Sequence, residues 1–191
     1  MRLRSIVFIL AAFVSLSAML TIAEVVAAEG KAKSRMIVAT GKERQRRIGT
    51  FYYLRKHPGG AYAAVVRAFG TPTSQRDDGA NDCILRWKPL GLEISLGVGS
   101  SSPCSNASLK RDYWYGTKIA SRIWRTNRGL RIGDSLGHLK SIYPEATFRS
   151  GPRYWSLATV KKWGGLVFDL LEAKVKAGRV SAIVLPTGFL G

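Results

Sequence analysis

Residues that commonly carry catalysis or bind metals are scarce in this chain. Its two histidines, His57 and His138, have no cysteine or acid in a spacing typical of a metal or catalytic site. General base catalysis needs a base beside a nucleophile, and zinc needs several ligands, so this pattern favours ordinary surface or partly packed histidines. We therefore predict no catalytic residue, no bound metal and no cofactor, and expect a protein that is not an enzyme.

Three aspartates form the densest group of acids. Asp77, Asp78 and Asp82 share a short segment with Gly79 and Asn81, which suggests a calcium site. The spacing departs from the EF-hand loop, because no acid stands at its twelfth position and glycine is not sixth. A solvated turn is the favoured interpretation.

Aromatic residues interleaved with arginines are the most suggestive feature. Tyr, Trp and Arg dominate the hot spots of protein interfaces, and aromatic faces also suit stacking on sugar rings. Alternatively, tryptophans fill the core, which we expect for Trp87 and Trp163 and leave open for Trp124 and Trp155. We expect exposure for 113–115, in a loop-like stretch. The candidate contact residues are Tyr113, Trp114, Tyr115, Trp124, Arg153, Tyr154 and Trp155.

The first 28 residues have the pattern of a secretory signal peptide. Two arginines precede an apolar stretch, and small residues lead to a cleavage site near Ala28. The alternative is an uncleaved anchor, since the apolar run approaches the length of a spanning helix. We predict export, with a periplasmic or extracellular location, and no transmembrane segment after removal of the signal.

The cysteine content agrees with export. Cys83 and Cys104 are the two cysteines of the chain, and an even count after an export signal predicts one disulfide. In the chain-entropy model a loop of this length adds about 3 kcal/mol of stability. Two reactive thiols are the alternative, and these would need lowered pKa values.

Basic residues outnumber acids by a wide margin. The formal net charge is +18 at pH 7. After export we expect no nucleic-acid partner, and the available polyanions are wall polymers, anionic lipid headgroups and acidic protein surfaces. The charge could instead serve only solubility. Residues 29–47 form a basic arm, predicted to be flexible with a possible short strand at Met36 to Ala39, which either binds an anionic surface or solvates the terminus.

Hydrophobic periodicity predicts an α+β domain over 48–191. A helix is expected at 60–69, with Tyr62, Val66 and Phe69 on its apolar face, and a second helix follows an N-cap at Asp134 or Ser135. Alternation predicts a hairpin over 83–98 and further strands at 118–125, 154–160, 166–172 and 179–185. Asp169 and Glu172 are expected to be exposed positions of one of these strands.

The order of elements is similar in the two halves, 48–125 and 126–191. The helical apolar residues recur at an offset of about 70 residues, which indicates an internal repeat. Each unit is expected to be a helix followed by three strands. The two units together predict one antiparallel sheet of about six strands with both helices packed on one face.

A short motif at the second helix carries a family resemblance. The segment Gly129-Leu130-Arg131-Ile132-Gly133-Asp134-Ser135, followed by Leu139 and Tyr143-Pro144, resembles the helix entry of small exported α/β repeat proteins. These include the tandem-repeat β-lactamase inhibitory protein and the outer-membrane assembly lipoproteins of the SmpA/OmlA type. The lipoproteins' lipidated cysteine is absent here. The resemblance implies an exported scaffold that contacts proteins or the envelope.

The residues together predict an exported, non-enzymatic binding protein with a protein or cell-envelope partner. The alternative is an accessory factor that adheres to an anionic wall or membrane surface through its basic charge. An enzyme with an unrecognised site is a third possibility. Salt separates the first two, because charge-driven adhesion weakens as ionic strength rises while an apolar contact survives.

Overall fold

The computed structural model describes residues 35–39, 46–52, 60–97, 104–105, 109, 112–151, 153–161 and 163–186. One compact unit begins at Met36. The predicted signal peptide, most of the predicted arm, and His57 lie outside the described residues. Within the described part of the chain, no helix has the length and apolar character needed to cross a membrane.

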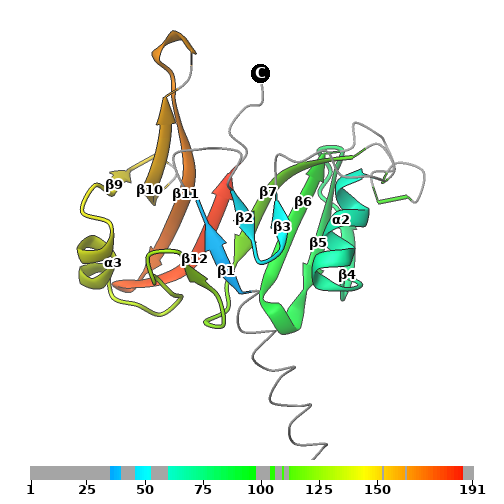
Figure 1. The fold of residues 1–191 in the computed structure, drawn as a ribbon, viewed down its shortest axis with the longest axis horizontal. Helices are drawn as coiled ribbons and strands as arrows, with labels where there is room; N and C mark the ends of the chain where they lie inside the picture. Colours follow the sequence, from blue (N-terminus) through cyan, green and yellow to red (C-terminus); the bar gives the residue numbers. More distant parts are fainter. Residues whose placement is uncertain are drawn as a thin grey trace, which may run out of the picture. The chain divides into compact units, whose positions relative to one another are not determined.

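A large antiparallel sheet of eight strands forms most of the fold (Figure 1). Its spatial order is β4-β5-β6-β7-β12-β11-β10-β9, so that β7 and β12 pair at the centre. The strands are β4 (Ser74–Asp77), β5 (Asp82–Trp87), β6 (Leu92–Gly97), β7 (Tyr113–Ile119), β9 (Thr147–Arg149), β10 (Tyr154–Lys161), β11 (Val167–Lys176) and β12 (Arg179–Pro186).

The mixed α+β class was predicted correctly, but the sheet is larger than the expected six strands. The two additional strands are its edges, β4 and β9, and all their residues are exposed. A strand without a buried face has no apolar alternation to reveal it. The predicted β5–β6 hairpin is present, and Leu85, Ile94 and Leu96 are fully buried on its core side.

The third strand lies earlier than predicted. β7 covers Tyr113–Ile119, whereas a strand was expected at 118–125 and a loop at 113–115. The core positions of β7 are Trp114, Thr117 and Ile119, all of them buried. A bulge between Trp114 and Gly116 breaks the strict period of two, so the alternation is not continuous in the sequence.

A second, smaller sheet has the order β3-β2-β1-β8. It contains β1 (Met36–Val38), β2 (Arg47–Ile48), β3 (Phe51–Tyr52) and β8 (Arg125–Thr126), with β1 and β8 parallel. Ile37 and Ile48 are fully buried in the core. The short strand predicted near Met36 is therefore confirmed, and parts of the predicted basic arm belong to the folded unit.

Both helices occupy the predicted positions. α2 (Gly60–Phe69) buries Ala61, Ala64 and Val65, whereas Tyr62 and Val66 of the predicted apolar face are only half-buried. Small side chains allow close packing of this helix on its neighbours. Asp112 accepts hydrogen bonds from the Ala61 and Tyr62 amides (2.8 and 2.6 Å), so the N-terminal cap of α2 comes from a residue far along the chain.

The second helix, α3 (Leu136–Ile142), is capped locally. The Ser135 hydroxyl accepts a hydrogen bond from the His138 amide, so of the two predicted N-caps, Asp134 and Ser135, the second caps the helix. Leu139 is fully buried in the core. Gly133 has a φ of +92°, and a Cβ there would lie 2.9 Å from the Arg122 side chain, so glycine is required at this approach to the helix.

One buried arginine bridges the place where β11 and β12 separate. The pairing of these strands ends at Glu172 and Val184. Beyond that point Arg46 Nη2 donates hydrogen bonds to the Leu170 carbonyl of β11 (3.1 Å) and the Pro186 carbonyl of β12 (2.7 Å). Its guanidinium also lies 5.3 Å from the centre of the Trp114 ring. Arg46 is 3% exposed. Its two hydrogen bonds therefore take the place of the backbone hydrogen bonds that β11 and β12 no longer make with each other there.

We predict that Arg46→Met lowers the free energy of unfolding by about 3 kcal/mol. Methionine retains an apolar stem but leaves one buried and one partly buried carbonyl group without this donor, and a buried unsatisfied group costs about 1–3 kcal/mol. The measurement is urea unfolding. Arg47→Met is the matched control: Arg47 is half-buried against Tyr52, and its loss should cost under about 1 kcal/mol. Equal losses in the two variants would contradict the role of Arg46.

Candidate functional site

Exposed apolar side chains gather at one end of the large sheet. Its strand register places Tyr113 opposite Gly97 and Gly116 opposite Pro186, and the turn between β10 and β11 lies toward the same end (Figure 1). Six large hydrophobic side chains are exposed among the described residues, and four of them lie here: Tyr113 (55%), Tyr115 (47%), Leu166 (63%) and Val167 (49%). We call these four residues the apolar end.

The Tyr113 ring lies over the neighbouring strand. A Cβ on Gly97 would overlap the end of this ring, so the absence of a side chain at position 97 leaves space for the ring in its present position. Tyr113 nevertheless remains more than half exposed. A tyrosine presents a large contact area at a small entropic cost because its side chain has only two rotatable χ angles.

The bulge in β7 sets the orientation of the next residues. Leu96 pairs with Trp114 and Ser95 pairs with Gly116, so Tyr115 is the additional residue. Trp114 is buried and its Nε1 donates to the Thr117 hydroxyl at 2.9 Å. Of the predicted contact cluster 113–115, the structure therefore exposes the two tyrosines and uses the tryptophan in the core.

The turn between β10 and β11 supplies the other two residues. Trp163–Gly165 form a single 3₁₀ turn, and Gly164 and Gly165 have φ angles of +82° and +78°, a region that favours glycine. Leu166 and Val167 follow directly. The side chain of Trp163, predicted to be in the core, lies outside what the structure describes.

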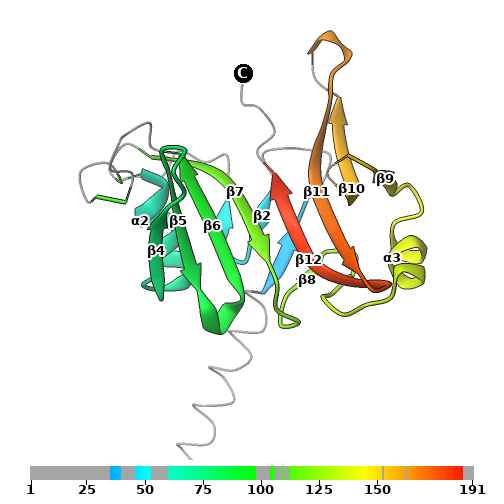
Figure 2. The ribbon, with the colours of Figure 1, turned by 180° about the vertical axis from the view of Figure 1, so that it is seen from behind.

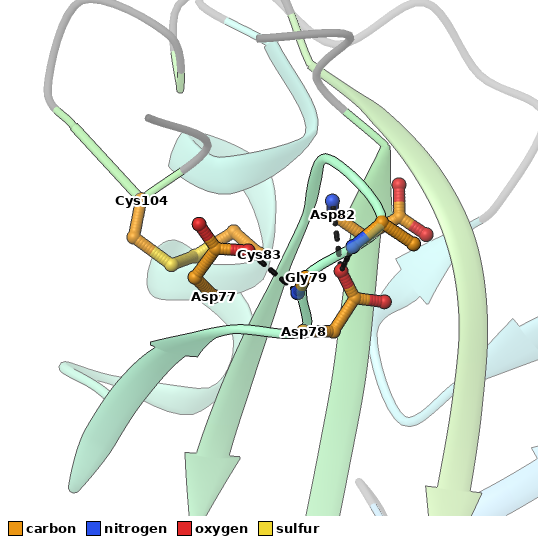
Figure 3. Close-up of a disulfide and its surroundings, with 7 residues drawn as sticks. Asp77, Asp78, Gly79, Asp82, Cys83 and Cys104 are labelled. Carbon is orange, nitrogen blue, oxygen red and sulfur yellow. Dashed lines mark hydrogen bonds between the residues drawn. A yellow bond between two sulfur atoms is a disulfide. The ribbon is translucent and has the colours of Figure 1, made fainter. Parts of the chain in front are cut away.

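The predicted disulfide is present at the same end of the sheet, between Cys83 of β5 and Cys104 (Figure 3). Cys83 is fully buried. In the adjacent turn, Asp77 Oδ1 accepts a hydrogen bond from the Gly79 amide, and Asp78 Oδ1 accepts from the Ala80 and Asp82 amides. The Asp77 and Asp78 carboxylates thus stabilise the exposed turn between β4 and β5, as expected, whereas Asp82 is buried and begins β5.

A polar cluster on β10 and β11 was not predicted. Tyr154 donates a hydrogen bond to Asp169 Oδ2 (2.6 Å), and Ser156 donates to Asp169 Oδ1. Glu172 pairs with Ser156 in the register and is buried, so the expectation that Asp169 and Glu172 are exposed was wrong. A bulge at Leu170 lies between the two acids, so a regular period of two does not predict which side of the strand each of them occupies.

Burial and the interactions within the cluster change the pKa values of Glu172 and Tyr154. Burial and, second, the charge of Asp169 raise the pKa of Glu172 to about 7. Burial and the hydrogen bond to Asp169 raise the pKa of Tyr154. Burial and then the charge of Asp78 also raise the pKa of Asp82, near the disulfide. Perturbed carboxyls mark functional sites in many proteins, and also structural networks.

The other predicted contact residues are dispersed. Trp124 is 1% exposed and donates from Nε1 to the Leu90 carbonyl (2.7 Å), so it belongs to the core. Trp155 is half-buried against Phe148 and Lys140. Arg153 is exposed where β10 begins, and Tyr154 is held by Asp169. These residues lie toward the other end of the sheet from Tyr113, so the structure does not bring the predicted set together.

The described residues offer little for metal or histidine chemistry. In the described ranges, no three His, Cys, Asp or Glu side chains are placed to hold a metal ion. His138 is exposed on α3, with its Nε2 3.7 Å from Asp134.

Comparisons with known proteins give no function. No family model and no curated protein matches the chain. Among solved structures, the chain is similar to the uncharacterized protein yfeY from Escherichia coli, with a TM-score of 0.40 and 10% sequence identity over 80% of this chain and 99% of that one. A similarity at this level carries no functional argument.

We predict that the protein loses stability as the pH rises from about 5 to about 8. With a pKa raised to about 7, Glu172 binds a proton in the folded state that the unfolded state has already released, so folding weakens as this proton is lost. Glu172→Gln should flatten this dependence and add about 2 kcal/mol at pH 8, measured by urea unfolding. Glu145→Gln, on an exposed pair with Arg128, is the control and should leave the dependence in place.

We also predict that Cys83→Ser with Cys104→Ser lowers the free energy of unfolding by about 3 kcal/mol in the chain-entropy model. The measurement is denaturant unfolding of both proteins with and without reductant. Reductant should destabilise the wild-type protein by a similar amount and leave the double variant unchanged. Equal stability of the oxidised wild type and the double variant would contradict a structural role of the bond.

Proposed function

We propose that the protein is an exported, non-enzymatic binding protein whose contact surface is the apolar end, Tyr113, Tyr115, Leu166 and Val167. The observation that carries the proposal is the concentration of exposed large hydrophobic side chains at this one end. Single exposed apolar residues are common on monomers, but a gathering of them is typical of contact sites. The partner is a protein or a component of the cell envelope.

The composition of this end agrees with binding. Two tyrosines lie within three residues at the start of β7, where Tyr113 pairs with Gly97 of β6 and Tyr115 is the additional residue of the bulge. Tyrosine is enriched in interface hot spots because it combines a large apolar face with a polar tip. The disulfide at the same end is compatible with an oxidising, extracytoplasmic location.

We further propose a two-repeat scaffold with the helices on one face. α2 precedes β4 to β7, and α3 precedes β9 to β12, so each unit has four strands and not three. The units meet through their last strands, β7 and β12. The small sheet and α2 lie in front of the large sheet in Figure 1 and behind it in Figure 2, so these two elements cover the same face of the large sheet. This arrangement agrees with the resemblance to exported tandem-repeat proteins.

Adhesion to an anionic wall or membrane surface is the second candidate function. The net charge of +18 and the sequence pI of about 10.5 favour it. It differs from the first candidate in its dependence on salt, since long-range attraction between exposed charges is screened at high ionic strength.

We predict that Tyr113→Ser with Tyr115→Ser reduces partner capture about tenfold or more. The tagged protein is incubated with native envelope and culture fluid and washed in low and then high salt. Ile123→Ser is the matched control, because Ile123 is also an exposed apolar side chain but lies after β7, at the opposite end of the sheet. Thermal unfolding verifies that each variant is folded.

The proposal requires that material retained at high salt is lost from the tyrosine variant and kept by Ile123→Ser. Equal capture by both variants would remove the tyrosines from the contact surface. Retention of heterogeneous anionic material that leaves at high salt would favour charge-driven adhesion instead.

A further inference from the structure

The outer part of the β10–β11 hairpin extends beyond its neighbouring strands. The pairing of β10 with β9 ends at Ser156, and the pairing of β11 with β12 ends at Glu172. From there to the turn, the paired residues of the two strands, Ala158 to Lys161 and Val167 to Leu171, have no other strand partner among the described residues. Figures 1 and 2 both show the hairpin projecting past the sheet.

The end of this ribbon is apolar. Leu166 and Val167 are 63% and 49% exposed, and the two glycines before them allow a tight turn. A two-stranded ribbon has no core of its own in which to bury such residues. Leucine gains about 1.5–3 kcal/mol when it leaves water, so a projecting turn of this kind favours an apolar environment outside the molecule.

The flanking charge is basic. Lys161 is exposed and pairs with Val167 across the ribbon. In the sequence, Lys162 and Trp163 follow it, and no acid occurs from Val160 to Phe168. Lysine stems extend along apolar surfaces while the ammonium groups reach anionic headgroups, and tryptophan is enriched at membrane interfaces. This composition is complementary to an anionic bilayer surface.

The size of the tip also favours a membrane over a protein. A specific protein interface commonly buries about 800 Å² on each partner, with some 20–30 residues on each side. A single turn that exposes two large apolar residues offers far less surface. Insertion into the interfacial layer of a membrane needs only a small apolar tip and favourable charge, since affinity rises with buried apolar area and with attraction to anionic lipids.

We propose that the tip of the β10–β11 hairpin, Leu166 and Val167 with Lys161 beside them, inserts into the interfacial layer of membranes that contain anionic phospholipids. This inference rests on the proposed function, because it uses two of the four residues of the apolar end and names their partner. The tyrosines of β7 are the other half of the apolar end, and the capture experiment tests them independently of the hairpin tip.

The test is co-sedimentation of the full protein with phosphatidylcholine vesicles that contain or lack phosphatidylglycerol. The wild-type protein should bind the anionic vesicles and bind the neutral ones much more weakly. Leu166→Ser with Val167→Thr should weaken binding to anionic vesicles about tenfold or more, because the tip loses apolar area while position 167 keeps a β-branched residue. Lys161→Glu should weaken it about tenfold through reversal of one charge.

Ile123→Ser is the matched control and should bind as the wild type does, because this apolar residue lies at the opposite end of the sheet. All variants are first compared by thermal unfolding and circular dichroism. Salt provides a second readout: the difference between the wild type and the Leu166→Ser/Val167→Thr variant should persist at high ionic strength, where the general attraction of a basic protein is screened.

Two results would overturn the membrane inference. Absence of binding to the anionic vesicles would do so, and so would binding that is equal for the wild type and the tip variant and disappears at high salt. In either case the capture experiment with Tyr113→Ser and Tyr115→Ser still decides the proposed function. If capture of a protein is lost from the tip variant while vesicles are not bound, the tip is a protein contact and the membrane inference fails.

Discussion

The separation of β11 from β12 depends on the buried guanidinium of Arg46. Two strands can part inside a fold only if the backbone groups that they leave find other partners, because an unpaired buried carbonyl is costly. Arg46 supplies donors to one carbonyl on each strand and packs against Trp114 of β7. It also precedes β2 directly, so the same residue connects the small sheet with the centre of the large one.

The consequence of that separation is an asymmetric sheet. At the end of the sheet where β5 ends at Trp87, aromatic residues pack against one another: Phe69 makes edge contacts with Phe51, Trp87 and Trp124. At the other end the hairpin leaves the sheet and tyrosines lie on the surface. Aromatic residues of this chain therefore lie both in the core and on the surface. Those at the first end are packed together, and Tyr113 and Tyr115 at the other end are exposed.

The polar cluster at Tyr154, Ser156, Asp169 and Glu172 of the β10–β11 hairpin includes a buried carboxyl group whose ionisation is unfavourable. Close to the hairpin's bulges at Leu157 and Leu170 lies the buried Glu172, whose pKa is raised to about 7, and Asp169 accepts hydrogen bonds from Tyr154 and Ser156 in the same cluster. Buried carboxyls of this kind reduce stability in the ionised state. The hydrogen bonds of the cluster connect β10 with β11, in addition to the backbone pairing of the two strands.

The sequence by itself determined the features that depend on neighbouring residues. Periodicity located α2, and the Ser135 cap located α3, while alternation located the β5–β6 hairpin and the cysteine count predicted the disulfide. The edge strands and the shift of β7 were missed because exposed strands and bulges lack a regular apolar period. Only the tertiary structure decided that Arg46 and Trp124 are buried, that Glu172 is enclosed and that Tyr113 and Leu166 share one end, because these depend on contacts between residues far apart in the chain.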